Sequence, residues 1–115
     1  MTPQVIVHNV RQPLPEGYTA VYVGRRTSFK PAYGEDFSVL GNPFTLPRYT
    51  RDEAVDAYRA RLDTLLYTAT QAEWEAMLRL TERVMAGEKL ALACWCSPAR
   101  CHAECIRDVL LEAVG

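Results

Sequence analysis

Four residues with reactive or metal-binding side chains, Cys94, Cys96, Cys101 and His102, lie close together in this chain. They follow an apolar run at residues 89–95, which is typical of a strand buried on both faces. Ser-Pro comes next, a favourable N-cap followed by a residue suited to the first helical position, so we predict a helix start there. Cys101 and His102 would then lie in the first helical turn, where backbone N–H groups stabilise thiolates and attract anions.

The residue types of this cluster support three interpretations. Cys96 and Cys101 can be reactive thiols beside His102, which can act as a general acid or base or donate a hydrogen bond to an anion. Alternatively, Cys94, Cys96, Cys101 and His102 can bind zinc. In the third interpretation, Cys94 and Cys105 are small core residues. Because structural zinc sites usually join more distant segments, we favour no metal and expect the domain to fold without zinc.

A second candidate group is cationic. Arg25 and Arg26 follow a predicted strand at residues 19–24. An arginine fork opposite helix N–H groups would hold a phosphate or carboxylate by charge-assisted hydrogen bonds. Arg100 in a first helical turn is unfavourable for the helix dipole, which suggests a role in binding rather than in stability. We therefore predict an anion site that includes Arg25, Arg26, Ser97 and Arg100.

The segment at residues 27–49 has no periodicity of a helix or strand and is interrupted by Gly and Pro. Loops of this length in small domains are usually functional or disordered, and the aromatic residues here argue against disorder. Within it, Asn42 precedes Pro43 in a predicted rigid turn. The Asn42 amide either stabilises that turn or contacts a base or sugar of a ligand, and the sequence leaves both possibilities open.

Three strands and three helices are expected to position these residues. Strands are predicted at residues 4–9, 19–24 and 90–95. Capping boxes at Thr50–Glu53 and Thr70–Glu73 begin two helices, and the third follows the last strand. We expect one α/β domain over residues 1–115, with a small single-layer sheet, mostly parallel, and helices packed against it. Ligands of such sheets bind at the carboxyl ends of strands, so both candidate groups should share one edge.

Two aromatic residues are expected to have packing roles. Tyr58 lies on the apolar stripe of the predicted helix after Thr50, so we place it in the core. Trp95 alternates away from Cys94 and Cys96 along the predicted strand, so we expect it to pack on the opposite face.

Composition restricts the function further. The 115 residues are 49% hydrophobic, enough for a core, and carry a formal net charge of -1, which argues against sequence-independent nucleic-acid binding. No pattern of a signal peptide or of a ~20-residue membrane span is present. We therefore expect a cytoplasmic protein without a membrane partner.

Three fragments carry a resemblance to a known family. Residues 21–25 (Val-Tyr-Val-Gly-Arg), 40–44 (Leu-Gly-Asn-Pro-Phe) and 92–96 (Leu-Ala-Cys-Trp-Cys), continued by Pro98 and the pair Cys101–His102, resemble the signature of the domain of unknown function 4326 family of phages and bacteria. The resemblance covers nearly the whole chain. It implies a shared site and no assigned reaction, and the phage occurrence suggests nucleotide or nucleic-acid metabolism.

The sequence therefore predicts an enzyme or binding protein for a nucleotide or another phosphorylated small molecule. Its candidate catalytic residues are His102, Cys96 and Cys101, and its candidate ligand-binding residues are Arg25, Arg26, Asn42, Ser97 and Arg100. The alternative function is a non-catalytic zinc-binding interaction module that uses the Cys/His cluster.

Overall fold

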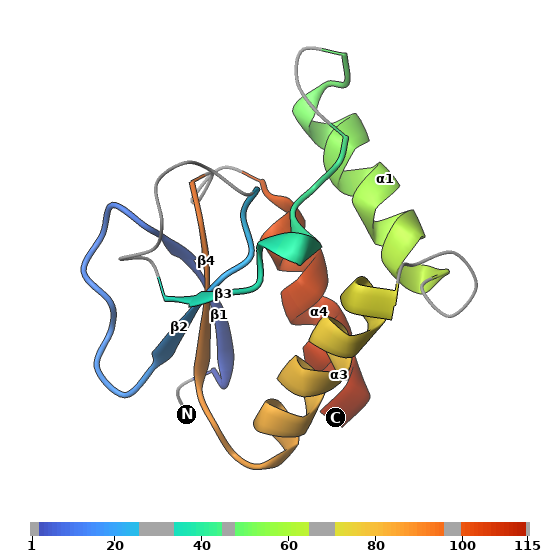
Figure 1. The fold of residues 1–115 in the computed structure, drawn as a ribbon. Coiled ribbons are helices and arrows are strands. Elements are labelled where there is room, and N and C mark those ends of the chain that lie inside the picture. The colour runs from blue at the N-terminus through green and yellow to red at the C-terminus, as the bar shows by residue number, and fades with distance from the viewer. Residues whose placement is uncertain (1–2, 26–33, 45–47, 65–70, 96–99, 115) are drawn as a thin grey trace.

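A four-stranded parallel sheet forms one layer of the protein (Figure 1). The structure is a computed structural model that describes residues 3–25, 34–44, 48–64, 71–95 and 100–114. The strands are β1 (Val5–Asn9), β2 (Thr19–Tyr22), β3 (Glu35–Asp36) and β4 (Leu90–Cys94), in the order β1-β4-β2-β3. All described pairings are parallel, so the four carboxyl ends meet at one edge.

Strand β4 is central because its sequence is apolar throughout. Leu90 to Cys94 are all buried, and β4 pairs with β1 on one side and β2 on the other. The register places Cys94 opposite Asn9 and Ala93 opposite Tyr22. Cys94 therefore ends the innermost strand at the edge where the other strands also end.

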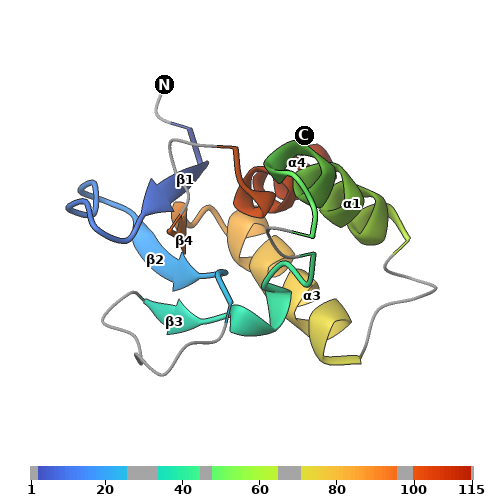
Figure 2. The same ribbon diagram turned by 90° about the horizontal axis from the view of Figure 1, so that it is seen from above.

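Three helices lie on one side of this sheet: α1 (Arg51–Asp63), α3 (Gln71–Met85) and α4 (His102–Val114) (Figure 2). Helix α4 contacts β1 and β4, and both α1 and α3 pack beside α4. A short 3-10 helix, η1 (Ser38–Leu40), packs on α3. Burying the apolar face that the helices share with the sheet supplies the main stabilising free energy of such a fold.

The predicted fold class is confirmed, and the predicted strands are found within two residues of their expected ends. The predicted capping box of α1 is also present, since Thr50 Oγ1 accepts from the Glu53 N–H and the Glu53 carboxylate accepts from the Thr50 N–H. Thr70 lies outside the described residues. Tyr58 is in the core, as expected, at 3% exposure.

Two expectations about secondary structure were wrong. The segment at residues 27–49 contains β3 and η1, because Phe37 N–H bonds the Tyr22 carbonyl oxygen at 2.8 Å and draws a short strand onto the sheet edge. Helix α4 begins at His102, later than the predicted helix, so Arg100 and Cys101 are not helical. None of the described helices is long and apolar enough to span a membrane.

Candidate functional site

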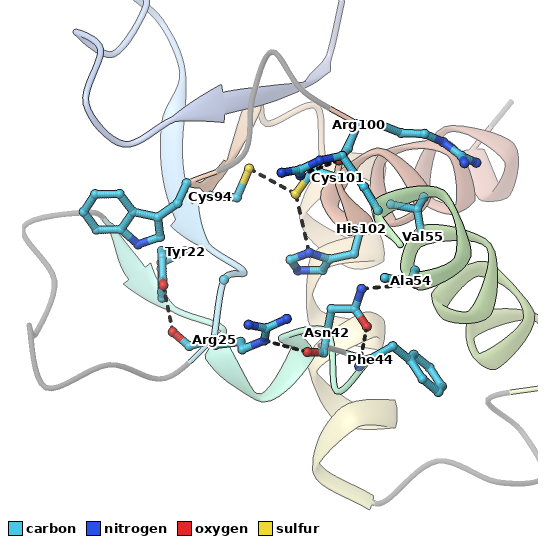
Figure 3. Close-up of a pocket in the computed structure, with 13 residues that line it drawn as sticks. Tyr22, Arg25, Asn42, Phe44, Ala54, Val55, Cys94, Arg100, Cys101 and His102 are labelled. Atoms are coloured by element: carbon cyan, nitrogen blue, oxygen red, sulfur yellow. Dashed lines mark hydrogen bonds between the residues drawn. The ribbon is translucent and has the colours of Figure 1, made fainter. Parts of the chain in front are cut away.

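A pocket lies at the carboxyl ends of β2 and β4, between the sheet edge and the N-terminal end of α1 (Figure 3). Its cavity volume is about 440 Å³, within the range of small-molecule sites. The lining combines arginines, a buried amide, thiols, an imidazole and apolar side chains. Its main polar members are Arg25, Asn42, Arg51, Cys94, Cys101 and His102.

Arg25 is held by the chain that follows β2. Its Nε donates to the Asn42 carbonyl oxygen at 2.8 Å, and its own carbonyl oxygen accepts from the Tyr22 hydroxyl at 2.7 Å. Gly41 runs close to this segment, because a Cβ there would lie 2.9 Å from the Arg25 Cα. The 40–44 turn is thus packed against the end of β2, and it orients the guanidinium at the pocket.

Asn42 is buried, and its amide has two structural partners. Nδ2 donates to the Ala54 carbonyl oxygen at 3.2 Å, and Oδ1 accepts from the Phe44 N–H at 2.9 Å. Asn42 therefore joins the 40–44 turn to α1. Of the two roles left open by the sequence, this geometry favours the structural one.

Arg51, the first residue of α1, is a pocket residue that the sequence analysis missed. Its Nη1 donates to the Arg100 carbonyl oxygen at 3.1 Å. A basic residue in the first turn of a helix is unfavourable for the helix dipole. The same argument that predicted a binding role for Arg100 could therefore have identified Arg51 from the sequence.

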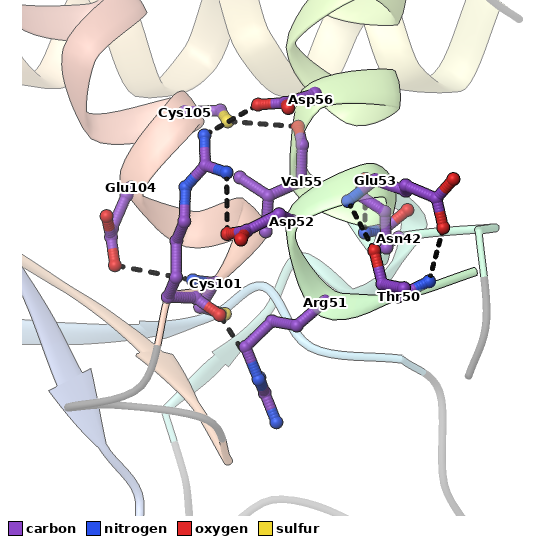
Figure 4. A network of polar contacts seen from close by, with 12 residues as sticks. Asn42, Thr50, Arg51, Asp52, Glu53, Val55, Asp56, Cys101, Glu104 and Cys105 are labelled. Carbon is purple, nitrogen blue, oxygen red and sulfur yellow. Dashed lines mark hydrogen bonds and ion pairs between the residues drawn. The ribbon is translucent and has the colours of Figure 1, made fainter. Parts of the chain in front are cut away.

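The Arg100 guanidinium has two carboxylate partners on α1, Asp52 and Asp56, and these two carboxylates are labelled in Figure 4. Nη1 lies 3.0 Å from Asp52 Oδ1, and Nη2 lies 2.7 Å from Asp56 Oδ1. The prediction that Arg100 lies in the first turn of a helix was wrong, because Arg100 precedes α4. Arg100 does line the pocket, so its predicted role in ligand binding stays a prediction. Arg100 joins the start of α4 to α1.

Three reactive side chains meet in the wall of the pocket. Cys101 Sγ lies 3.3 Å from Cys94 Sγ and 3.5 Å from His102 Nδ1. Both sulfurs are buried, with the residues exposed by 1% and 2%. The parallel register places Cys94 at the end of β4, and the turn into α4 places Cys101 against it.

His102 connects α4 to the end of β2. Its Nε2 lies 2.7 Å from the Val23 carbonyl oxygen, which can only accept, so Nε2 carries the hydrogen. The pKa of His102 is lowered, mainly by burial and further by the nearby charge of Arg25. The hydrogen bond to Val23 acts in the opposite direction and is a smaller effect than burial. The ring is thus neutral at pH 7, and Nδ1 is an acceptor that faces the Cys101 thiol. The imidazole ring also packs edge-on against Tyr58, at a centroid distance of 4.9 Å.

Cys101 occupies the N-cap position of α4. Its N–H lies 3.3 Å from a Glu104 carboxylate oxygen, and its carbonyl oxygen accepts from the Glu104 N–H at 3.0 Å. The expectation that the Cys101 N–H is free to bind an anion was wrong, because Glu104 reaches back from the third helical position as in a capping box.

Arg26, Cys96 and Ser97 were predicted as site residues and lie outside the described residues. Of the four candidate zinc ligands, the structure places Cys94, Cys101 and His102. Among described residues, no set of three or more His, Cys, Asp or Glu side chains is arranged to hold a metal ion.

Cys105 and Trp95 complete the surroundings of the site. Burial raises the pKa of the Cys105 thiol, and its Sγ lies 3.6 Å from the Val55 carbonyl oxygen.

Trp95 lines the pocket and is exposed, and the Arg11 guanidinium lies 5.1 Å from its ring centroid. The expectation that Trp95 is a packing residue was therefore wrong, because β4 ends at Cys94.

The fold and the pocket define a small α/β protein with a candidate site at the carboxyl ends of parallel strands. The family model described as Domain of unknown function (DUF4326) matches residues 7–112, so the chain belongs to that family. The resemblance seen in the sequence is thereby confirmed. Searches of curated proteins and of solved structures found no match.

Proposed function

We propose that this protein binds a nucleotide or a similar phosphorylated small molecule in the strand-end pocket, with the phosphate between Arg25 and Arg51. The observation that carries the proposal is that a backbone carbonyl oxygen anchors each of these guanidinium groups at the pocket. An anchored guanidinium keeps further N–H groups for a phosphate and loses less side-chain entropy when the ligand binds.

The ion pairs of the other arginines support this assignment. Among the ten described arginines, carboxylates pair with five: Arg59, Arg61, Arg83, Arg100 and Arg107. Of the five described arginines without an ion pair, Arg25 and Arg51 are the two that line the pocket. In the described part of a chain with a net charge of -1, two cations without carboxylate partners thus lie at one pocket.

The apolar part of the lining supports a ligand with a flat or apolar portion. Phe44, Ala54, Val55 and Trp95 line the same cavity as the arginines. Aromatic and aliphatic linings with few polar groups are typical of small-molecule sites. The base of a nucleotide would pack against this lining while the phosphate of the same nucleotide reaches the two arginines.

Calorimetric titration tests this function. The probes are a nucleoside 5′-monophosphate, its parent nucleoside and inorganic phosphate. We expect the monophosphate to bind more tightly than the nucleoside, and Arg25→Ala and Arg51→Ala each to weaken its binding about tenfold. Arg79→Ala is the matched control, because Arg79 is an exposed arginine on α3 away from the pocket lining.

The proposal fails if none of a panel of nucleoside monophosphates binds, or if Arg25→Ala and Arg79→Ala have equal effects. The predicted catalytic roles of His102, Cys96 and Cys101 stay proposals. Cys101 and His102 line this pocket and could act on a ligand bound there.

A further inference from the structure

We propose that Cys94 and Cys101 form a reversible disulfide by exchange with a low-molecular-weight disulfide, which makes this pair a redox site in the pocket wall. The two sulfur atoms lie 3.3 Å apart (Figure 3). A disulfide bond measures about 2.05 Å, so the sulfurs need to approach by little more than one ångström. This proposal does not depend on phosphate binding.

The surrounding backbone keeps the two thiols together. Cys94 is in the sheet ladder opposite Asn9, and its carbonyl oxygen accepts from the Val10 N–H at 3.0 Å. Cys101 is held from the other side by Glu104. Folding has thus already brought the thiols together, and a disulfide between preorganised thiols is more stable than one that must close a free loop.

His102 favours Cys101 as the attacking thiol. Its Nδ1, 3.5 Å from Cys101 Sγ, is the acceptor of a neutral ring whose other nitrogen is occupied by Val23. Nδ1 can therefore take the Cys101 proton as the thiolate forms, and the thiolate is the nucleophile of disulfide exchange. We therefore assign Cys101, whose sulfur lies beside this base, as the attacking thiol, and Cys94, whose sulfur lies 3.3 Å from that of Cys101, as the resolving thiol.

The chemistry balances in two exchange steps. The Cys101 thiolate attacks one sulfur of the small disulfide, the S–S bond breaks, and one small thiolate leaves and takes up the proton from His102. Cys94 then attacks Cys101 Sγ of the mixed disulfide and expels the second small thiolate, which takes up the proton that Cys94 loses. Cys94 and Cys101 are oxidised by two electrons together, and the small disulfide is reduced to two thiols.

Glutathione disulfide is a suitable probe. After incubation and acid quenching, free thiols are alkylated and the parent protein is digested with trypsin, which cleaves after Arg100 and separates Cys94 from Cys101. We expect a disulfide-linked pair of peptides, residues 90–100 with 101–107, whose fragmentation assigns the bond to Cys94 and Cys101. Dithiothreitol should reverse it, and the oxidised protein should melt about 5 °C or more above the reduced one.

Single variants test the order of attack. Cys94→Ala should accumulate one glutathione on Cys101, whereas Cys101→Ala should form neither the mixed disulfide at Cys94 nor an internal bond. Cys105→Ala is the matched control and should still form the bond, because the Cys105 thiol faces the Val55 carbonyl oxygen. Two results in the parent protein would overturn the proposal. One is a disulfide from Cys101 to Cys96 or Cys105, and the other is full alkylation of every thiol after treatment with glutathione disulfide. Because both are measured in the parent protein, they decide the question even if a variant fails to fold.

Discussion

The Arg25 guanidinium donates from Nε to the carbonyl oxygen of Asn42 at 2.8 Å. This bond links the end of β2 to the 40–44 turn, and both segments belong to the fragments that resemble the family signature. Because Nε is occupied, the two terminal nitrogens of Arg25 form the end of the side chain that can reach a ligand.

Arg25→Lys should weaken binding of a nucleoside monophosphate nearly as much as Arg25→Ala, by about fivefold to tenfold. A lysine keeps the charge and loses both the anchoring bond to Asn42 and the planar fork. Calorimetry compares the two variants with the parent. Full affinity in Arg25→Lys would show that charge alone is recognised at this position.

Arg100→Ala should leave ligand affinity within about twofold of the parent and lower the melting temperature. The hydrogen bonds that Arg100 donates to Asp56 and Asp52 raise the pKa of Arg100, so it is charged throughout the accessible range and joins α4 to α1. The decrease in melting temperature should become smaller as salt is added, because salt screens exposed ion pairs. A tenfold loss of affinity with an unchanged melting temperature would instead show that Arg100 contacts the ligand.

Asn42→Ala should lower the free energy of unfolding by about 2 kcal/mol or more, because it leaves the Ala54 carbonyl oxygen and the Phe44 N–H without their partner. Urea unfolding measures this. Asn9→Ala is the control, since the Asn9 side chain accepts from the Arg11 N–H at an exposed position. Equal losses in the two variants would contradict the structural role assigned to the Asn42 amide.

The stability of the protein should fall as the pH is lowered below about 6.5. Burial keeps the pKa of His102 below its usual value of 6.5 in the folded state, so the unfolded chain binds more protons in this range. The contribution is present above pH 6.5 and is lost as the pH falls through the folded-state pKa, with a limiting slope of about 1.4 kcal/mol per pH unit. Urea unfolding at pH 7.5, 6.5 and 5.5 should show a shallower dependence in His102→Gln, and identical slopes would exclude His102 as the cause.

Local patterns predicted the α/β class, the central strand and the N-terminal cap of α1 because the causes are local or periodic. An uncharged apolar run from Leu90 to Cys94 is stable only when buried on both faces, and Thr50 and Glu53 bond each other within one helical turn. The family could be predicted for the same reason, since its signature consists of short fragments.

Three features of the site depend on contacts between segments far apart in the chain. Arg100 was predicted as a ligand-binding residue, and the sequence did not show that Asp52 and Asp56 on α1 pair with it or that Arg51 also lines the pocket. His102 was recognised, but only the approach of the Val23 carbonyl oxygen fixes which nitrogen carries its hydrogen.

The sequence by itself determined which elements form and that reactive residues follow β4, because hydrogen bonding within a turn and burial of an apolar run act over a few residues. The tertiary structure decided which charges are neutralised and which thiols are neighbours. Cys94 and Cys101 meet because β4 and the start of α4 pack together, and a pairing of that kind depends on the position of the whole helix against the sheet.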